Sequence, residues 1–394
     1  MKIAILTSGI LPVPSVQGGA VENLIDFYLD YNNHYKLHEI TVYSVYHPLV
    51  KKHPALISDV NHYYHIKTEG LLSRIKRKIY YHTHHKNYYN HFIEFFFEKA
   101  YNLIKKQDYD YILLENRPGY AHKLSQRGYR NIILHLHNDL LNNCTQYHQE
   151  IFDNLKLILT VSDYIRNRVS SIKEDQKIQT IHNGINLQQF SIQNKSLINR
   201  ADIGFNQNDC VLIYSGRINK DKGISELIDA MLLLEKHTNI KLLIIGSTFF
   251  GNENKDNPFV SSLKERCYKI KERIIFTGFI SYDKMPLYLQ LANIAVIPSI
   301  WNDPFPTTVL EAQAMGLPII STKRGGIPEE VSMENAILLE VDDNLVNNLA
   351  QTILHLSQNP EKRNAMAKAS IEHSKRFDKG TFSRNFFNAI ENLN

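Results

Sequence analysis

Short apolar runs alternate with longer segments of helical spacing along most of the 394 residues. Several of these runs are followed by a loop and then by a segment in which apolar side chains recur every three or four positions. The clearest strand-like runs are KIAILT at 2–7, YILLE at 111–115, IILHLHN at 132–138 and VLIYSG at 211–216. Such alternation predicts an α/β fold in which helices connect the strands of doubly wound sheets.

The order of these segments predicts two domains and a linker. The first α/β domain is predicted to cover residues 1–186, a linker rich in Asn, Gln and Ser residues 187–205, and the second α/β domain residues 206–376. With 43% hydrophobic residues, the chain is long enough to give each domain its own core. The final stretch, 377–394, carries phenylalanines at helical spacing, which predicts a terminal amphipathic helix.

Cysteine usage and hydropathy favour a protein of the reducing cytoplasm. Cys144, Cys210 and Cys267 are far apart and odd in number, so they indicate neither a zinc site nor a disulfide framework. We find no run of about 18 apolar residues, and we interpret the apolar amino terminus as a first strand rather than a secretory leader. A cytoplasmic chain without a membrane span is therefore expected.

The excess positive charge lies in the first half of the chain. Residues 1–190 contain 22 Lys and Arg against 17 Asp and Glu, whereas the remainder contains 23 of each class. An acid-free segment at 71–91 holds Arg74, Lys76, Arg77, Lys78 and Lys86. Tyrosines interrupt this segment and four phenylalanines follow it at 92–97.

Two interpretations of this basic, aromatic segment remain open. Such a segment can bind the anionic face of a membrane, where each cation contributes about 1 kcal/mol and aromatic rings favour the interface. This predicts peripheral attachment to the inner face of the cell membrane. The alternative is a solvated helix that packs its aromatic side chains inward. No binding motif supports nucleic acid as a partner.

The segment 301–330 carries the most informative chemistry, because Asp303 and Glu311 stand eight positions apart around a turn. Two prolines lie between them and cannot sit inside a helix, so we expect the helix to begin near Thr307 or Thr308. The free amides and the dipole of a helix start favour a diphosphate, and Glu311 one turn further in can reach the vicinal hydroxyls of a ribose. The alternative is a core helix with a capping acid and a solvated acid.

Arg217 and Lys222 are two of the cations that follow the strand-like run at 211–216, before the next helical pattern. In open α/β sheets, ligands bind beyond the carboxyl ends of the strands, so Arg217 and Lys222 are placed to meet an anionic group. Arg offers a planar fork to phosphate oxygens and Lys a point charge. Each cation alone would be a solvated loop charge, but together with the Asp303–Glu311 loop they predict a sugar-nucleotide site.

These residues resemble the family 4 retaining glycosyltransferases, which have the GT-B architecture of two Rossmann-like domains facing across a cleft. The family's E-x7-E loop stands here as Asp303-x7-Glu311, with the first acid one methylene shorter. Pro306 replaces a residue, commonly glycine, that could donate its N–H. The resemblance implies that Glu311 holds the ribose, Asp303 contacts the transferred sugar, and Arg217 and Lys222 bind the diphosphate.

The same resemblance implies further contacts with the donor. Sugar and phosphate contacts are implied for the loop around Phe305, Thr307 and Thr308, and contacts with the nucleobase for Phe279 and Ile280. Family members also send their last helix, here about 377–394, back onto the first domain.

The amino-terminal half supplies glycines and histidines. Gly18 and Gly19 precede a helical segment and can present amides to a phosphate, although a glycine pair more often marks a turn. By the period of two, His135 and His137 share one face of their strand. Two histidines at this spacing are structural or can ligate a metal. The resemblance places His137 at the donor sugar as the active-site histidine and gives His135 a supporting role.

No metal and no cofactor are predicted. The acidic pair at 108–110 imitates a metal-binding DxD, but it precedes a strand, where an acidic turn is the better account. The developing charge on the leaving diphosphate would instead be stabilised by Arg217, Lys222 and helix-end amides.

The resemblance implies a retaining, metal-independent hexosyltransferase of polysaccharide or lipopolysaccharide biosynthesis. It would transfer a hexose or N-acetylhexosamine, with GlcNAc or Glc favoured, from a UDP-sugar to a hydroxyl of a cell-envelope or surface glycan, including a lipid-linked acceptor. The alternatives are a non-catalytic glycosyltransferase-like partner subunit, a protein O-glycosyltransferase and a UDP-sugar epimerase of the same fold.

Overall fold

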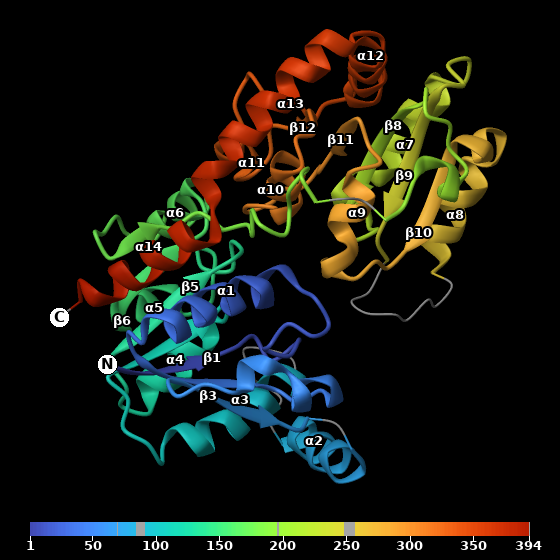
Figure 1. Cartoon of the computed structure of the whole chain (residues 1–394). Helices are drawn as coiled ribbons and strands as arrows, with labels where there is room; N and C mark the ends of the chain where they lie inside the picture. The colour runs from blue at the N-terminus through green and yellow to red at the C-terminus, as the bar shows by residue number, and fades with distance from the viewer. Residues whose placement is uncertain (69, 84–90, 195–196, 248–256, 394) are drawn as a thin grey trace. The chain divides into compact units, whose positions relative to one another are not determined.

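The computed structural model describes the chain except for residues 69, 84–90, 195–196, 248–256 and 394. It contains two compact units, one formed by Met1–His182 with Gly380–Asn394 and the other by Asn183–Lys379. Each unit is a parallel sheet with helices on both faces (Figure 1). Among the described residues, no helix combines the length and the apolar character needed to cross a bilayer.

A seven-stranded parallel sheet forms the centre of the first unit, in the order β3-β2-β1-β4-β5-β6-β7. The strands are β1 (Lys2–Leu6), β2 (Glu39–Val45), β3 (Asn61–Ile66), β4 (Tyr111–Glu115), β5 (Ile132–Leu136), β6 (Leu155–Thr160) and β7 (Ile178–Thr180). The side chains of β4 and β5 are buried along their whole length, which is why these strands read as continuous apolar runs. The strand order reverses between β1 and β4, and this point defines where a ligand is expected.

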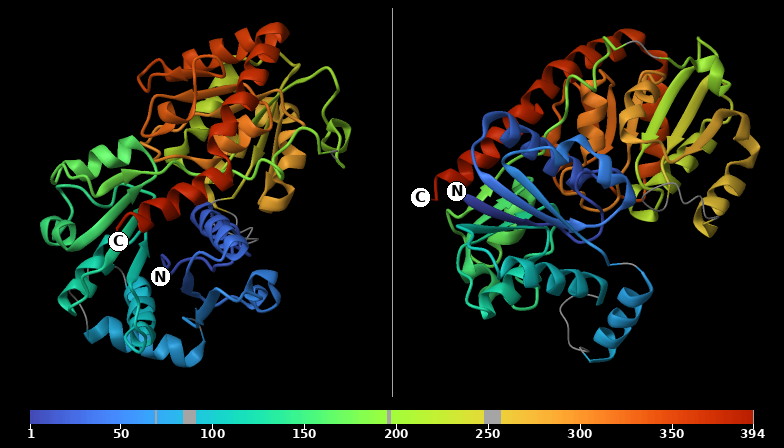
Figure 2. Two further views of the ribbon diagram at one scale, coloured as in Figure 1. Left: turned by 60° about the vertical axis from the view of Figure 1, so that its left-hand side comes forward. Right: turned by 60° about the horizontal axis from the view of Figure 1, so that its bottom comes forward.

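The helices of the first unit come from both ends of the chain. They are α1 (Ala20–Tyr35), α2 (Leu71–Thr83), α3 (His91–Ile104), α4 (Pro118–Gln126), α5 (His148–Asn154), α6 (Asp163–Ser170) and α14 (Lys379–Glu391). In Figures 1 and 2 the last helix, α14 in red, lies beside α1 in blue. The ring of Phe386 in α14 stacks on that of Tyr28 in α1 with centroids 4.2 Å apart. Residues near the end of the chain therefore complete the core of the first unit.

The aromatic part of the basic segment is buried. Phe95, Phe96 and Phe97 of α3 are 5%, 0% and 0% exposed, and Phe97 packs on Tyr120 of α4. At these positions the structure therefore confirms the second interpretation, in which the helix packs its aromatic side chains inward. A helix that follows a solvated basic stretch buries its apolar side against the sheet, because fully burying one such ring is worth about 1.5–3 kcal/mol.

A six-stranded parallel sheet forms the second unit, in the order β10-β9-β8-β11-β12-β13. The strands are β8 (Cys210–Ser215), β9 (Ile240–Ile245), β10 (Ile274–Gly278), β11 (Ile294–Ile297), β12 (Ile319–Thr322) and β13 (Ala336–Leu339). The helices are α7 (Ile224–Leu233), α8 (Pro258–Arg266), α9 (Met285–Leu289), α10 (Thr307–Ala314), α11 (Ile327–Glu330), α12 (Leu345–Gln358) and α13 (Pro360–Ser374). Side chains of α7, α8 and α12 join one hydrophobic core with the sheet.

Candidate active site

The sheet of the second unit has its switch point between β8 and β11. These strands pair with each other, while their outer neighbours are β9 on one side and β12 on the other. The loops after β8 and β11 therefore start side by side at the carboxyl edge of the sheet, which is where ligands of doubly wound folds bind. The loop after β8 carries Arg217 and the short 3₁₀ helix η4 (Lys220–Lys222), and the loop after β11 carries Asp303.

Backbone contacts hold these two loops together. The carbonyl oxygen of Asp221 accepts hydrogen bonds from the amides of Ile300 at 3.0 Å and Trp301 at 3.3 Å. Gly223 has a φ of +69°, and a Cβ at this position would lie only 1.8 Å from the carbonyl oxygen of Pro298. Only glycine permits this combination of left-handed backbone and close approach. The relative position of the two loops is thus fixed by the main chain.

Lys222 and Asp303, one from each loop, form an ion pair. Their side chains are 18% and 8% exposed, so water screens the pair only in part. The Lys222 ammonium also lies 5.7 Å from the ring centroid of Trp301, within the range of a cation–π contact. The amide of Gly326 donates to the carbonyl oxygen of Asp303 at 2.8 Å and so anchors its backbone. A diphosphate at this edge would compete with Asp303 for the lysine.

Glu311 lies in α10, which begins at Thr307 as the sequence predicts, and its side chain is buried. Burial raises the pKa of Glu311 to about 8, although a hydrogen bond with Thr307 works in the opposite direction. The carboxyl group is therefore mostly neutral at pH 6–7 in the absence of a ligand. Two hydroxyl donors, such as those of a ribose diol, would favour its ionised form.

A third acid, Glu330, faces the same region from the end of α11. It is fully buried, and both carboxylate oxygens lack a hydrogen-bond partner among the residues that the structure describes. Burial, with the negative charges of Asp303 and Glu329 adding to it, raises the pKa of Glu330 well above its usual value, and Lys222 opposes the shift. The acid is therefore held neutral. Glu330 is not among the site residues predicted from the sequence, although it follows the glycine pair and the proline of this segment.

The other predicted donor-site residues lie on these loops, at the start of α10 or directly after β10. Arg217 is exposed, and its carbonyl oxygen accepts a hydrogen bond from the Tyr214 hydroxyl at 2.7 Å. Phe305 is buried, and the side-chain amide of Asn183 donates to its carbonyl oxygen at 2.9 Å. The remaining four positions are half-buried: Thr307 and Thr308 open α10, and Phe279 and Ile280 directly follow β10.

In the first unit, Gly18 and Gly19 precede α1 with φ values of +76° and +107°. Glu22, in the first turn of α1, folds back onto Gly19, where a Cβ would lie 2.2 Å from its Oε2 atom. Burial raises the pKa of Glu22 to about 7, although a hydrogen bond from its own backbone amide opposes this rise in pKa. The amino end of α1 thus already holds a carboxyl group, which a phosphate bound there would have to displace.

The carboxyl ends of β4 and β5 carry a buried polar array. Glu115, the last residue of β4, is 0% exposed and accepts a hydrogen bond from the Tyr28 hydroxyl at 2.8 Å. His135 Nδ1 lies 3.2 Å and His137 Nε2 lies 2.7 Å from Glu115 Oε2. The two histidines share one strand face, as predicted, and both are turned toward the same carboxylate. Three ligand atoms of Glu115, His135 and His137 lie within 4.8 Å of one another, so the set also has the composition of a metal site.

Comparison with known proteins places the second half of this chain in a known family. Residues 196–373 match the family model described as "Glycosyl transferases group 1". The chain carries a group 1 glycosyltransferase domain. Among relatives of this chain, Spore coat protein SA of Bacillus subtilis (strain 168) is 29% identical over 384 residues, which is 94% of this chain and 93% of the relative.

A second sequence relative and a solved structure are also similar to this chain. Lipopolysaccharide 1,2-N-acetylglucosaminetransferase of Salmonella typhimurium is 24% identical over 201 residues, or 51% of each chain. The solved structure of Anabaena Alr3699/HepE in complex with UDP covers 100% of both chains with a TM-score of 0.73 and 19% identity. At that identity the likeness shows the fold. The predicted α/β fold with two Rossmann-like units is confirmed, as is the resemblance to GT-B glycosyltransferases.

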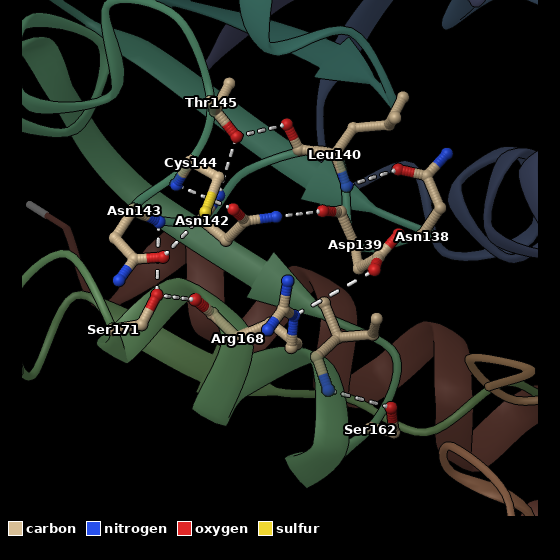
Figure 3. Close-up of polar contacts among 11 residues, drawn as sticks. Asn138, Asp139, Leu140, Asn142, Asn143, Cys144, Thr145, Ser162, Arg168 and Ser171 are labelled. Carbon is tan, nitrogen blue, oxygen red and sulfur yellow. Dashed lines mark hydrogen bonds and ion pairs between the residues drawn. The ribbon is translucent and has the colours of Figure 1, made fainter.

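The loop that follows His137 in the glycosyltransferase is braced by its own side chains (Figure 3). Asn142 donates from its side chain to the carbonyl oxygen of Asp139 at 2.7 Å, and its side-chain oxygen accepts from the amide of Cys144 at 2.9 Å. The Thr145 hydroxyl bridges the carbonyl oxygen of Leu140 and the amide of Asn142, both at 2.9 Å. Such local bonds replace regular structure, so the chain leaves the histidine in a defined direction.

The structure therefore gathers the predicted residues into two groups. Lys222, Asp303 and Glu311 lie around the switch point of the second unit, and His137 lies at the sheet edge of the first. Glu115 and Tyr28 were missed in the sequence. A charged residue that closes the apolar run YILLE was the available signal for Glu115, whereas nothing local in the sequence distinguishes Tyr28 from the other tyrosines.

Proposed function

We propose that the chain is a retaining glycosyltransferase that moves a hexose or N-acetylhexosamine from a UDP-sugar to a hydroxyl of a cell-envelope or surface glycan. The observation that carries this proposal is the Lys222–Asp303 ion pair beside the buried Glu311, at the switch point of a group 1 glycosyltransferase domain. In this proposal the cation Lys222 binds the diphosphate, the acid Asp303 contacts the sugar and the acid Glu311 binds the ribose diol. These are the three parts of a nucleotide sugar that a binding site must hold.

Electrostatic stabilisation supplies the chemistry in this proposal. As the bond between the sugar and the diphosphate lengthens, negative charge builds on the diphosphate oxygens, and Lys222 and Arg217 stabilise that charge. Asp303, released from Lys222, accepts hydrogen bonds from the transferred sugar. The acceptor hydroxyl attacks on the face that the diphosphate leaves, and a diphosphate oxygen takes its proton. These cations do what a metal ion does elsewhere, so we propose a metal-independent reaction.

The relatives support the choice of donor and acceptor. The solved neighbour Alr3699/HepE is described in complex with UDP and with UDP-glucose, and a curated relative is a lipopolysaccharide N-acetylglucosaminetransferase. We therefore favour UDP-Glc and UDP-GlcNAc as donors. Sugar specificity is expected to reside near Asp303, whose side chain is shorter than the family's glutamate.

The first test is a thermal-shift titration with UDP, GDP and ADP, with and without EDTA. Selective stabilisation by UDP that survives EDTA supports the donor assignment and metal independence, and loss with EDTA refutes the latter. A UDP-sugar panel is then assayed for UDP release with and without a membrane-glycan extract. Release that depends on acceptor supports transfer, release without acceptor indicates the epimerase of the same fold, and no binding of any nucleotide indicates a non-catalytic partner subunit. If the sugar of the UDP-sugar is radiolabelled, transfer of the label to protein would indicate the protein O-glycosyltransferase.

We also propose that the glycosyltransferase attaches peripherally to an anionic membrane through α2. Three apolar side chains of this helix point into solvent: Leu72 is 75% exposed, Ile75 50% and Ile79 58%. At about 100° per residue they fall within an arc of about 60°. Figure 2 shows α2, in light blue, at the outer edge of the first unit. An apolar stripe this narrow suits shallow insertion into a bilayer surface.

Lys76 and Lys78 lie on either side of this stripe at about 100° per residue, and Arg74 lies further round the helix. Arg74, Lys76 and Lys78 are exposed on α2, while Lys86 and the side chain of Arg77 lie outside the part that the structure describes. Cations beside an apolar stripe can extend their charged ends to lipid phosphates while their stems stay on the apolar side. The stripe thus replaces the phenylalanines of α3 as the inserting element.

Liposome co-sedimentation tests this attachment. The triple variant Arg74→Ala, Lys76→Ala, Lys78→Ala is expected to bind vesicles of 70% phosphatidylcholine and 30% phosphatidylglycerol roughly 100-fold more weakly, at about 1 kcal/mol for each cation. Lys51→Ala with Lys52→Ala removes two exposed lysines of the same unit and serves as the control. Equal binding of the native protein to pure phosphatidylcholine vesicles would contradict the proposal.

A further inference from the structure

In the core of the first unit, three polar side chains lie within hydrogen-bond distance of the carboxylate of Glu115. Glu115 Oε1 accepts the hydroxyl of Tyr28 at 2.8 Å, and His135 Nδ1 lies 3.3 Å from Oε1 and 3.2 Å from Oε2. His137 Nε2 lies 2.7 Å from Oε2, the shortest of these contacts. The Glu115 side chain is inaccessible to solvent, and that of His137 is 5% exposed. A buried carboxylate with three neighbours in hydrogen-bond range requires that the neighbours donate.

The ionisation states of Glu115, His137 and Tyr28 are consistent with an acceptor carboxylate surrounded by donors. Burial alone would raise the pKa of Glu115, but the two imidazoles hold it below its usual value. Burial and the neighbouring His135 lower the pKa of His137 to about 4, although Glu115 opposes this shift. At neutral pH the array therefore contains an ionised carboxylate and a neutral His137. The phenol of Tyr28 stays protonated, because burial raises its pKa well above 10.

This arrangement determines which nitrogen of His137 carries the proton. Because Glu115 is an acceptor only, a neutral His137 must place its proton on Nε2, which leaves a lone pair on Nδ1. His137 Nδ1 is buried and has no hydrogen-bond partner among the described residues. An unsatisfied buried acceptor costs about 1–3 kcal/mol and is satisfied by any group that brings a donor to it. Sugar hydroxyls are such donors.

We propose that Glu115 is a positioning residue that holds His137 as the Nε2–H tautomer, so that His137 acts on a ligand as a hydrogen-bond acceptor through Nδ1. Its contribution to sugar transfer rests on the proposed function, whereas the tautomer itself does not. Tyr28 and the Phe386 ring stacked on it support the carboxylate from α1 and α14. His135 faces the same carboxylate with Nδ1, so that nitrogen also carries a proton.

A bound metal is the competing interpretation of the same three residues. A metal ion would take the lone pairs of His135 Nδ1 and His137 Nε2, and neither nitrogen could then carry a proton. The observed separations are those of hydrogen bonds, and the Tyr28 hydroxyl occupies a further acceptor site of the carboxylate. The geometry therefore favours protons over a metal, and the NMR spectra of the two histidines distinguish these cases.

Long-range ¹H–¹⁵N spectra of protein labelled with ¹⁵N-histidine test the proposal directly. In the native protein at pH 7, after EDTA treatment, His137 is expected to show the Nε2–H pattern and His135 the Nδ1–H pattern. Glu115→Gln is expected to change the His137 pattern, because a glutamine amide can donate as well as accept. Tyr28→Phe removes one donor from the other carboxylate oxygen and is expected to leave the His137 pattern unchanged.

Kinetics provide the second readout. Glu115→Gln is expected to lower kcat roughly 10- to 100-fold, the range for partners that orient a functional histidine, with a smaller change in KM. Glu94→Gln is the matched control, because Glu94 is a buried carboxylate of the same unit that pairs with Lys123 and does not touch the array.

Three results would overturn the proposal. These are an Nδ1–H pattern for His137 in the native protein, stoichiometric metal in the purified protein whose removal changes both histidine patterns, and a Glu115→Gln variant with native kcat. If the native protein transfers no sugar but shows the expected tautomers, only the proposed function fails. The spectra of the native protein also decide the matter if the variant does not fold.

Discussion

Replacing Lys222 by alanine should have two separable consequences, because the lysine is paired with a nearly buried acid. Asp303 would lose its counter-ion while its side chain stays 8% exposed. Breaking a fully buried pair costs about 3–5 kcal/mol, and the partial exposure of Lys222 reduces this to about 1–3 kcal/mol. For a unit of this size, each kcal/mol lowers Tm by roughly 2–4 °C. We therefore expect Lys222→Ala to lower Tm by about 5 °C.

The second consequence concerns the ligand. Loss of a charge-assisted hydrogen bond to the diphosphate costs about 1.5–3 kcal/mol, which weakens UDP binding roughly 10- to 150-fold. Asp303→Asn should act in the opposite direction, because it removes the group that competes with diphosphate for Lys222. We expect Asp303→Asn to bind UDP at least as tightly as the native protein while losing sugar transfer.

Calorimetric titration with UDP and thermal unfolding of four proteins measure both effects. The set comprises the native protein, the two single variants and the double variant, which should recover most of the lost Tm but not the UDP affinity. Lys220→Ala, an exposed lysine of the same loop, is the matched control and should leave both quantities unchanged. A Lys222→Ala protein with native Tm and native UDP affinity would refute both the energetic role of the pair and the diphosphate assignment.

Four other predictions concern single residues and the binding of UDP. Folding raises the pKa of Glu311 from 4.5 to about 8. Its contribution to stability is therefore complete below pH 4.5 and is lost as pH rises through 8. We expect the Tm of the native protein to fall between pH 5 and 9, and the Tm of Glu311→Gln to fall less over the same range. UDP binding to the native protein should release a proton near pH 7, detected by calorimetry in two buffers of different ionisation enthalpy; no release would contradict diol binding by Glu311. Gly223→Ala should destabilise the second unit by several kcal/mol through contact with Pro298, whereas Gly204→Ala, with a φ of +77° but no atom within 4 Å, should cost only about 1 kcal/mol in chemical denaturation. Phe386→Ala should cost about 3–5 kcal/mol in the same assay, and a loss below 1 kcal/mol would show that α14 contributes little to the core.

Much of the fold could be predicted from sequence because its signals are local. The run YILLE becomes β4 with the predicted bounds, and the prolines after Asp303 place the start of α10 at Thr307. Both outcomes depend on short-range constraints, namely burial on two faces for the strand and missing N–H groups for the helix. Local patterns therefore sufficed for the elements themselves.

The pairing of side chains could not be predicted in the same way. Lys222 and Asp303 are 81 positions apart, and Tyr28 and Glu115 are 87 apart. Each contact depends on which strands become neighbours in the sheet and how far the loops extend. The two interpretations of the basic segment could not be separated from sequence for a related reason. Phe95–Phe97 look alike in sequence whether they meet a membrane or the sheet, and only tertiary packing decides between these. The exposed stripe on α2 likewise appears only when the partner helix is known.

The position of α14 has a consequence for how this chain is made. The first 182 residues supply every strand of the first unit, but Phe382, Phe386 and Phe387 are added to its core only after all residues of the second unit have been translated. Until then, the apolar face of α1 around Tyr28 has no cover, and the Glu115 array lacks the aromatic layer above it. The first unit to leave the ribosome is therefore the last to be completed. During synthesis, chaperones should accordingly bind the first unit more than the second. A stop codon just before α14 should destabilise the first unit more than the second unit, in whose residues the shortened chain ends.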